Sequence, residues 1–463
     1  MKYHGKQGSV GGVIMQNRLS GMRAFYLVAV GQFISIFGTS MTQFGLTIWS
    51  WKFVTEIQPS TNPATAMALV GFFNFAPEVL LSPISGVLVD RWNRKLVMII
   101  SDVAAGLATI AIFLLYSSGQ LQMWHLYVAG AWTGAFKSFQ WPAFSAAIST
   151  MVPKDQYTRA DGILGLTESL SGILAPPLAG LFLGLIGLTG IMTIDIITFL
   201  AAVAGVLLVT VPQPKVSTEG EVKRSIWKDS IFGFRFILQR PSLLGLQMIF
   251  FFGNLLGSLS GALVNPMILS RTGNNEFLLS WVQAAFGAGA VIGGLILVRT
   301  GGLKRRTNGI IWGWFFSTLF GSVVFGLGRS LPVWLIAAFF AALINIYINS
   351  SNQSIWQAKV PPDLQGRVFS ARRMIAQVVG PLGFLLAGPL ADRLFEPALR
   401  EGGRLTGTFG WLVGVGPGAG MALIIVITGV LTMVVVLIAY RVSAIRNAED
   451  ILPDHDVVSV AAA

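Results

Sequence analysis

The sequence predicts an all-α membrane protein with twelve transmembrane helices in two pseudo-symmetric six-helix bundles. Three observations lead to this fold class. Of the 463 residues, 54% are hydrophobic and only 11% are charged, whereas soluble proteins carry about a quarter charged residues. Apolar stretches of about 20 residues recur along nearly the whole chain. The chain also repeats itself at a fixed offset, because residues 153–180 match residues 361–388 without a gap.

The predicted spans follow the apolar runs in order. They cover residues 25–49, 64–89, 96–116, 122–150, 161–186, 190–211, 242–268, 277–298, 308–328, 332–358, 368–394 and 417–440. The first six form a bundle over residues 25–211, and the last six form a second bundle over 242–442. Residues 1–24 form a polar, basic tail without a signal-peptide pattern. Residues 212–241 form a linker with an interfacial helix, and 443–463 form the second tail.

The basic residues predict how the chain is oriented. The net charge is +12, and most of the 32 lysines and arginines fall in the two tails and in alternate loops. This asymmetry follows the positive-inside rule. It predicts a multi-pass protein of the cell membrane with both termini in the cytoplasm. It also accounts for the positive charge without nucleic acid, which we do not expect as a partner.

Motifs for catalysis are missing from the sequence. There is no cysteine, which excludes disulfides and thiolate metal sites. The nucleotide-binding pattern G-x-x-x-x-G-K-[ST], the hydrolase pattern G-x-S-x-G and the zinc pattern H-E-x-x-H are all absent. We therefore expect no enzyme activity, no cofactor and no metal, and we expect the protein to be a monomer.

Two charged residues inside the predicted spans share one depth. Glu78 and Lys137 lie about 18 and 21 Å from the same end of their helices at the α-helical rise. They can therefore form an ion pair. A charge within the bilayer is a functional candidate by default. Glu78 is our first candidate proton carrier and Glu168 the second; the alternative is a structural role in an ion pair or in helix packing.

A polar stripe occurs on two repeat-related spans. Lys137, Gln140, Trp141 and Phe144 are spaced as i, i+3, i+4 and i+7. The repeat offset carries Lys137, Trp141 and Phe144 to Asn345, Asn349 and Asn352. Polar groups on equivalent faces predict that both spans line a central, water-filled cavity. Hydrogen bonding between helices is the alternative. Further candidates for the lining are Gln43, Asn254 and Asn265.

The segment GVLVDRWNRK between the second and third spans resembles the signature loop of the major facilitator superfamily, G-x-L-x-D-R-x-x-R-K. The characteristic positions are occupied by Gly86, Asp90, Arg91, Arg94 and Lys95. The resemblance implies the major facilitator fold and a cytoplasmic gate loop that latches the two bundles together. We expect Asp102, seven residues beyond Lys95, to be a structural partner of this loop. Alternatively, the arginines only set the topology.

A second element, on the fifth predicted span, partly resembles the G-x-x-x-G-P-x-x-G-G pattern of proton-driven exporters in that superfamily. It contains Gly172, Pro176, Pro177 and Gly180. Across its twelve spans the chain is also similar to the branch with macrolide efflux proteins and the enterobactin exporter. This resemblance implies export.

These observations together predict a secondary active transporter that works by alternating access. The predicted activity is proton-coupled export (antiport) of amphipathic drugs or secondary metabolites. The expected partners are an amphipathic small molecule, protons and the lipid bilayer. Two alternatives remain open at this stage: a symporter or uniporter that imports a small nutrient, and a lipid scramblase or scaffold that transports nothing.

Overall fold

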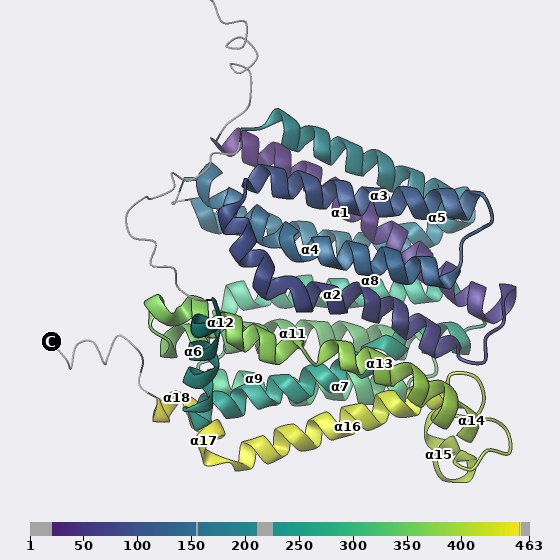
Figure 1. The fold of residues 1–463 in the computed structure, drawn as a ribbon. Helices are drawn as coiled ribbons and strands as arrows, with labels where there is room; N and C mark the ends of the chain where they lie inside the picture. The colour runs from purple at the N-terminus through teal and green to yellow at the C-terminus, as the bar shows by residue number, and fades with distance from the viewer. Residues whose placement is uncertain (1–20, 154–155, 211–225, 453, 455–463) are drawn as a thin grey trace, which may run out of the picture.

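The computed structural model describes residues 21–153, 156–210, 226–452 and 454. The side chains of Gly86, Asp90, Arg91, Trp141 and Glu168, on which predictions fall, lie outside the described residues. The described chain is built from helices, coloured from purple to yellow in Figure 1.

The first group of helices contains five long elements. They are α1 (Gly21–Lys52), α2 (Pro63–Arg91), α3 (Arg94–Ser117), α4 (Met123–Met151) and α5 (Tyr157–Leu208), with a short π-helix, η1 (Phe53–Ile57), after α1. Within this group α1 and α3 pack against α5, and α2 and α3 pack against α4. The group occupies the upper half of Figure 1.

The second group occupies the lower half of Figure 1. Its long helices are α7 (Pro241–Arg271), α8 (Glu276–Thr300), α9 (Arg306–Thr318), α11 (Leu331–Lys359), α12 (Pro362–Gln377), α13 (Gly380–Leu390) and α16 (Ala419–Arg441). The shorter elements are η3 (Leu319–Val324), α10 (Phe325–Leu327), η4 (Ala391–Phe395), α14 (Glu396–Ala398), α15 (Thr406–Val413), α17 (Ser443–Arg446) and α18 (Ala448–Ile451). α6 (Ile226–Leu238) packs on α12.

The two groups meet along two helix pairs. α2 packs against α13, and α5 packs against α8. Both contacts are tight where small residues face the neighbouring helix. A Cβ atom on Gly388 of α13 would overlap the backbone of Thr65, and one on Gly180 of α5 would come within 3.1 Å of Ser280 Cβ. The antiporter-like element from Gly172 to Gly180 therefore lies on the α5 segment that faces α8.

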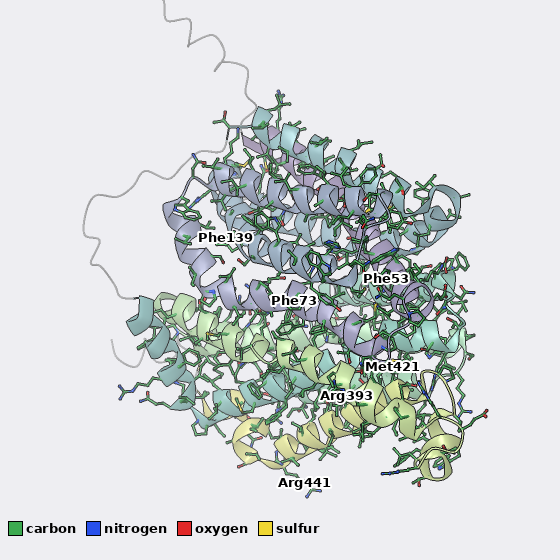
Figure 2. All side chains as sticks on the ribbon, turned by 45° about the vertical axis from the view of Figure 1, so that its right-hand side comes forward. Phe53, Phe73, Phe139, Arg393, Met421 and Arg441 are labelled. Atoms are coloured by element: carbon green, nitrogen blue, oxygen red, sulfur yellow. The ribbon has the colours of Figure 1, made fainter. Side chains whose placement is uncertain are left out.

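The described residues include ten helical segments that are long and apolar enough to cross a membrane. Large apolar side chains on their outer faces are exposed: Leu185 is 69% and Ile438 is 61% exposed, and many side chains project outward from the ribbon in Figure 2. Such a surface suits acyl chains rather than water. The prediction of an all-α, multi-pass membrane protein is confirmed.

The predicted number of twelve spans differs from these ten for two identifiable reasons. α4 is not one of the ten segments, although its 29 residues are enough for a span. One of the ten, Ser169–Leu208, contains a break at Gly187. Gly187 has φ 67° and ψ −179°, a conformation that is essentially restricted to glycine. The break falls between the predicted spans 161–186 and 190–211, and twelve spans stay a prediction.

Candidate functional site

A cavity of about 630 Å³ lies among α1, α2, α3, α4 and α5 and is bordered by α7 and α13 of the second group. Its wall mixes apolar and polar side chains. The apolar part includes Met67, Phe75, Phe199 and Phe384, and the polar part includes Gln43, Asn74, Lys137 and Asn265. Phe75 of α2 and Phe384 of α13 meet across the two groups, with ring centroids 6.2 Å apart. The cavity wall is therefore shared between the two groups.

Four residues predicted to line a cavity do so. Gln43, Lys137, Gln140 and Asn265 all belong to the wall. Two of the four come from the polar stripe on α4. Lys137 and Gln140 are about one turn apart and project from the same face of this helix, so both reach the cavity.

Lys137 also forms the predicted ion pair. Its Nζ lies 3.2 Å from Glu78 Oε2, with 59% and 28% of the two side chains exposed. Equal depth on the neighbouring helices α2 and α4 brings the two groups together, as the sequence indicated. Lys137 belongs to the cavity wall and Glu78 does not. The ion pair therefore places an ammonium group at the wall, with its partner carboxylate outside the wall.

Asp102 has different partners from those we expected. Its carboxylate is 5% exposed and accepts hydrogen bonds from Gln32 Nε2 at 2.8 Å and Gln140 Nε2 at 2.6 Å. All three residues line the cavity. The predicted partnership with the Arg-rich loop is therefore corrected: the carboxylate points into a layer formed by α1, α3 and α4.

The gate loop itself is described only in part. The structure describes Arg94 and Lys95, whereas the side chains of Gly86, Asp90 and Arg91 lie outside the described residues. Lys95 Nζ donates to the carbonyl oxygens of Leu207 at 2.9 Å and Val209 at 2.6 Å. It thereby ties the start of α3 to the end of α5. These carbonyls are free to accept because they belong to the last turn of a helix.

Four asparagines that we predicted to line the cavity, three of them from the repeat, lie away from it. Asn349 Nδ2 donates to Asn345 Oδ1 at 2.7 Å, within α11. Asn352 is buried and accepts from Trp356 Nε1 at 2.9 Å, one turn further on. Asn254 Nδ2 donates to the Ala376 carbonyl at 2.9 Å and so joins α7 to α12. None of these asparagines belongs to the cavity wall. The bond of Asn254 joins two helices, which is the alternative that we weighed, whereas the bonds of Asn349 and Asn352 lie within α11.

Asp195 is an acidic residue within a predicted span that was not among our candidate site residues. It is 1% exposed, lines the cavity, and accepts from Thr39 Oγ1 at 2.9 Å and Thr109 Oγ1 at 3.3 Å. A signal was present in the sequence, since an acidic residue within a span is a functional candidate. The spacing of Thr39 and Thr42 by three residues also places two hydroxyls on one helix face.

The two groups are joined by polar contacts at one end, which we call the clasped end. It comprises residues 51–65, 270–276 and 391–421 and lies on the right of Figure 1. Asp392 caps the first turn of α2: its carboxylate accepts from Ala64 N at 3.1 Å, Thr65 N at 2.7 Å and Thr65 Oγ1 at 2.7 Å. Positive backbone dipoles at a helix N-terminus favour such a carboxylate.

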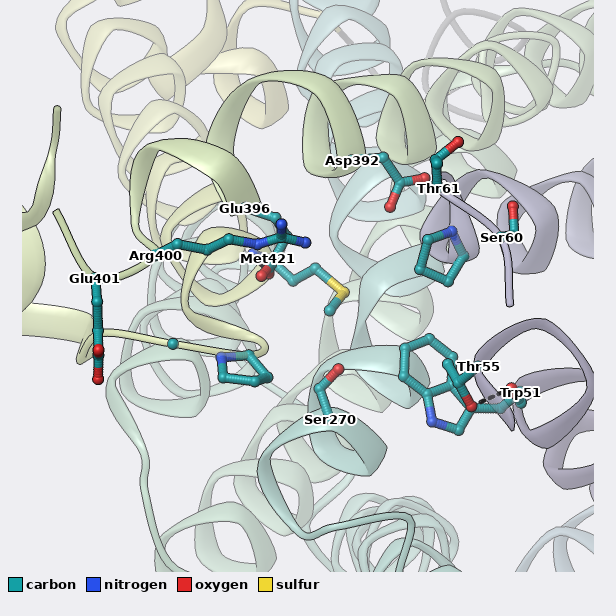
Figure 3. A pocket seen from close by; sticks show the side chains of 13 residues that line it. Trp51, Thr55, Ser60, Thr61, Ser270, Asp392, Glu396, Arg400, Glu401 and Met421 are labelled. Atoms are coloured by element: carbon teal, nitrogen blue, oxygen red, sulfur yellow. Dashed lines mark hydrogen bonds between the residues drawn. The ribbon is translucent and has the colours of Figure 1, made fainter. Parts of the chain in front are cut away.

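Further contacts reinforce the clasped end. Trp51 Nε1 donates to Asn274 Oδ1 at 2.6 Å, and Asn274 Nδ2 donates to Glu56. Lys52 Nζ lies 3.4 Å from Glu276 Oε1. A second pocket of about 510 Å³ opens among these residues, and Figure 3 shows Asp392, Glu396 and Arg400 on one side of it and Trp51 on the other.

The described residues contain no group of three or more His, Cys, Asp or Glu side chains that could hold a metal ion. The site therefore consists of a mixed polar and apolar cavity, one ion pair and two buried carboxylates. This arrangement can enclose a small molecule. It offers no nucleophile with an adjacent base among the residues described above.

Known proteins resemble this chain in sequence. Residues 28–384 match the family model of the Major Facilitator Superfamily. Macrolide efflux protein A of Streptococcus pyogenes is 24% identical over 384 residues, which cover 80% of this chain and 90% of that protein. The enterobactin exporter EntS of Escherichia coli O81 (strain ED1a) is 24% identical over 368 residues, which cover 77% of this chain and 83% of that protein.

Solved structures share the fold. A bacterial homologue of the human lysosomal transporter Spinster, inward-facing and unoccupied, has a TM-score of 0.63 at 14% identity, covering 90% of this chain and 95% of that one. A bacterial homologue of the iron transporter ferroportin in its inward-facing state has a TM-score of 0.62 at 16% identity, covering 92% and 100%. Since the family model spans well over half of the sequence, the chain belongs to the major facilitator superfamily: it is a multi-pass membrane transporter and not an enzyme.

Proposed function

We propose that this transporter exports amphipathic small molecules, drugs or secondary metabolites, by alternating access. The observation that carries the proposal is the cavity of about 630 Å³, whose wall comes from both groups of helices. Relative movement of the two groups would change which end of this cavity is open. The names of the two relatives, an efflux protein and an exporter, support export as the direction.

The lining supports an amphipathic cargo. Aromatic rings of Phe75, Phe199 and Phe384 provide apolar contact area, while Gln43 and Asn74 provide amide donors and acceptors. Ligand sites of this kind are mostly apolar with a few polar groups that fix orientation. A stereospecific importer of a polar nutrient would need more directional groups, and the α11 asparagines, which could have supplied them, are outside the wall.

The clasped end indicates which side of the transporter is closed in this conformation. The positive-inside rule puts both termini in the cytoplasm, and in that orientation the clasped end faces outward. The contacts of Asp392, Trp51 and Lys52 would then close the outer side, and export would require them to break. We propose that outward opening separates α2 from α13 at Gly388 and Asp392.

Proton coupling is assigned to the Glu78–Lys137 pair, with Glu168 as a second carrier. Protonation of Glu78 removes the negative charge that holds the Lys137 ammonium 3.2 Å away. Lys137 is then an uncompensated cation at the cavity wall, which disfavours a cationic or weakly polar cargo. Release of the proton restores the pair. Exchange of proton and cargo on opposite sides would give antiport.

The test is efflux from inverted vesicles or proteoliposomes with an imposed pH gradient. The substitution Glu78→Gln should abolish the dependence of efflux on the pH gradient. The control is Asp450→Asn, which removes the carboxylate of the Arg305–Asp450 ion pair; the Asp450 side chain is 69% exposed. This substitution should leave efflux unchanged. Undiminished, pH-driven efflux by the Glu78→Gln protein would remove Glu78 from this role, and gradient-driven uptake would reverse the direction we propose.

A further inference from the structure

Asp102 is a buried acidic residue of the cavity wall that the proposed mechanism does not yet use. It is 5% exposed, and it lines the cavity of about 630 Å³. Gln32 of α1 donates to one oxygen of its carboxylate at 2.8 Å, and Gln140 of α4 donates to the other at 2.6 Å. Asp102 therefore links α1, α3 and α4 at a place that water in the cavity can reach.

The ion pairs found among the described residues do not include Asp102. The other charged or histidine side chains that the structure describes on α1, α3, α4 and α5 are Arg23, Lys52, Arg94, Lys95, His125, Lys137 and Asp195. Of these, Lys137 and Asp195 line the cavity together with Asp102. Lys137 is paired with Glu78, and Asp195 is itself an acid. The amides of Gln32 and Gln140 are therefore the groups that stabilise the Asp102 carboxylate.

The two buried acids of the cavity differ in the chemistry of their partners. Asp195 contacts the hydroxyls of Thr39 and Thr109, and a hydroxyl can accept a hydrogen bond as well as donate one. Those partners suit a neutral carboxylic acid. The NH₂ groups that face Asp102 can only donate, so they favour the ionised form, whereas burial acts against its charge. Opposing effects of this kind allow Asp102 to change its protonation state.

We propose that Asp102 is a further proton-binding residue of this transporter, with Gln32 and Gln140 as its positioning residues. The carboxylate takes a proton from water in the cavity and becomes a neutral acid, and it later returns the proton to water. The bound proton turns one carboxylate oxygen from an acceptor into a donor. One of the two glutamines must then rotate its amide so that Oε1 accepts, or lose its bond. Proton binding therefore changes the link among α1, α3 and α4.

The depth of Asp102 suits exchange of this proton with the cytoplasm. It lies seven residues beyond Lys95, about 10 Å along α3, and the orientation that we propose puts this end of α3 in the cytoplasm. The inference deepens the proposed antiport and rests on that function for its role in transport. Proton binding by Asp102 does not itself depend on the cargo, on the direction of transport or on Glu78.

The test is infrared difference spectroscopy of the purified full-length protein, without cargo, while the pH is lowered. The C=O stretching band of a buried, protonated carboxyl group should appear, and Asp102→Asn should remove it. Asp195→Asn is the matched control, because it removes the other buried acid of the cavity and should keep the titrating band. Glu78→Gln should keep it as well. A spectrum without a titrating band, or a band that persists in the Asp102→Asn protein, would overturn the proposal.

A second comparison tests the role of the amides. Gln140→Leu removes one donor to the carboxylate and should raise the proton affinity of Asp102 roughly tenfold, which moves the midpoint of the band by about one pH unit to higher pH. The control is Gln43→Leu, which removes a cavity amide that is not a partner of Asp102, and its midpoint should stay unchanged. This comparison decides if the Asp102→Asn protein does not fold, and equal midpoints would contradict the proposal. Neither measurement involves cargo or a gradient, so their failure is distinct from a failure of export.

Discussion

Asp392 at the clasped end provides a test of how the two groups of helices are held together. Its carboxylate accepts three hydrogen bonds from the first turn of α2, two of them 2.7 Å long. The substitution Asp392→Asn keeps the size of the side chain but removes the charge. It also turns an amide NH₂ toward the donors of Thr65 and Ala64. The clasp should therefore weaken without a change in packing.

The magnitude follows from these contacts. Hydrogen bonds to a charged group contribute roughly 1.5–3 kcal/mol each, against about 0.5–1.5 kcal/mol for neutral ones. A carboxylate at a helix N-terminus adds about 0.3–1 kcal/mol through the helix dipole. Three bonds that change from charged to neutral each lose about 1–1.5 kcal/mol, so we expect the clasped conformation to lose roughly 3–5 kcal/mol relative to an unclasped one. A shift of about 2.7 kcal/mol is a hundredfold change, enough to bring a 99% population to about one half.

The assay is a distance measurement between two spin labels across the clasped end. The sequence has no cysteine, so a pair of introduced cysteines at Thr61 and Glu401 is labelled without further substitutions. Both positions border the pocket of the clasped end. The Asp392→Asn protein should show a second, longer distance that is weak or absent in the unmodified protein.

The control is Glu276→Gln, which breaks the Lys52–Glu276 pair at the same end. This pair is 3.4 Å long, with 38% and 30% of its side chains exposed, and exposed pairs contribute less than about 1 kcal/mol. Its distance distribution should stay close to that of the unmodified protein. If Asp392→Asn gives the same distribution as Glu276→Gln, the cap on α2 does not hold the clasp, and our reasoning is refuted.

Three further predictions concern packing and charge. Gly187→Ala should lower stability by about 1–3 kcal/mol, because φ is 67° there; in thermal unfolding, Gly184→Ala is the control, since a Cβ atom at Gly184 meets nothing within 4 Å. Gly388→Val should open the clasped end in the same spin-label assay, because its side chain would overlap Thr65; an unchanged distance would contradict the close contact of α2 and α13. Lys137→Gln should reduce cargo selectivity and leave Glu78 unpaired, and a transport rate identical to that of the unmodified protein for every cargo tested would contradict its place at the cavity wall.

The sequence predicted most of the fold because bilayer thickness restricts what an apolar run can do. The predicted span 25–49 lies within α1, and 277–298 lies within α8. The ends were less predictable, because helices extend beyond the bilayer until a cap stops them. Asn275, for example, caps the start of α8, where its side chain accepts from Leu278 N at 3.0 Å.

The site was predictable only where depth and helix face agreed. Glu78 and Lys137 share a depth on adjacent helices and form the expected pair. The repeat offset was misleading for Asn345, because the cavity lies within the first group of helices and touches the second only at α7 and α13. Asp195 was not predicted to line the cavity, because its contacts with Thr39 and Thr109, which are distant in sequence, form only after α1, α3 and α5 pack.

The most direct test of the account is whether the cavity opens alternately to the two sides of the membrane. Gln43, a cavity residue, would be replaced by cysteine in this cysteine-free chain and labelled with a membrane-impermeant thiol reagent. The control is Ile197→Cys, since Ile197 is 60% exposed and lies outside the cavity wall. During turnover we predict labelling of Gln43→Cys from each side in right-side-out and inverted vesicles, with Ile197→Cys unlabelled. Labelling from one side only under every gradient and cargo condition would contradict the account.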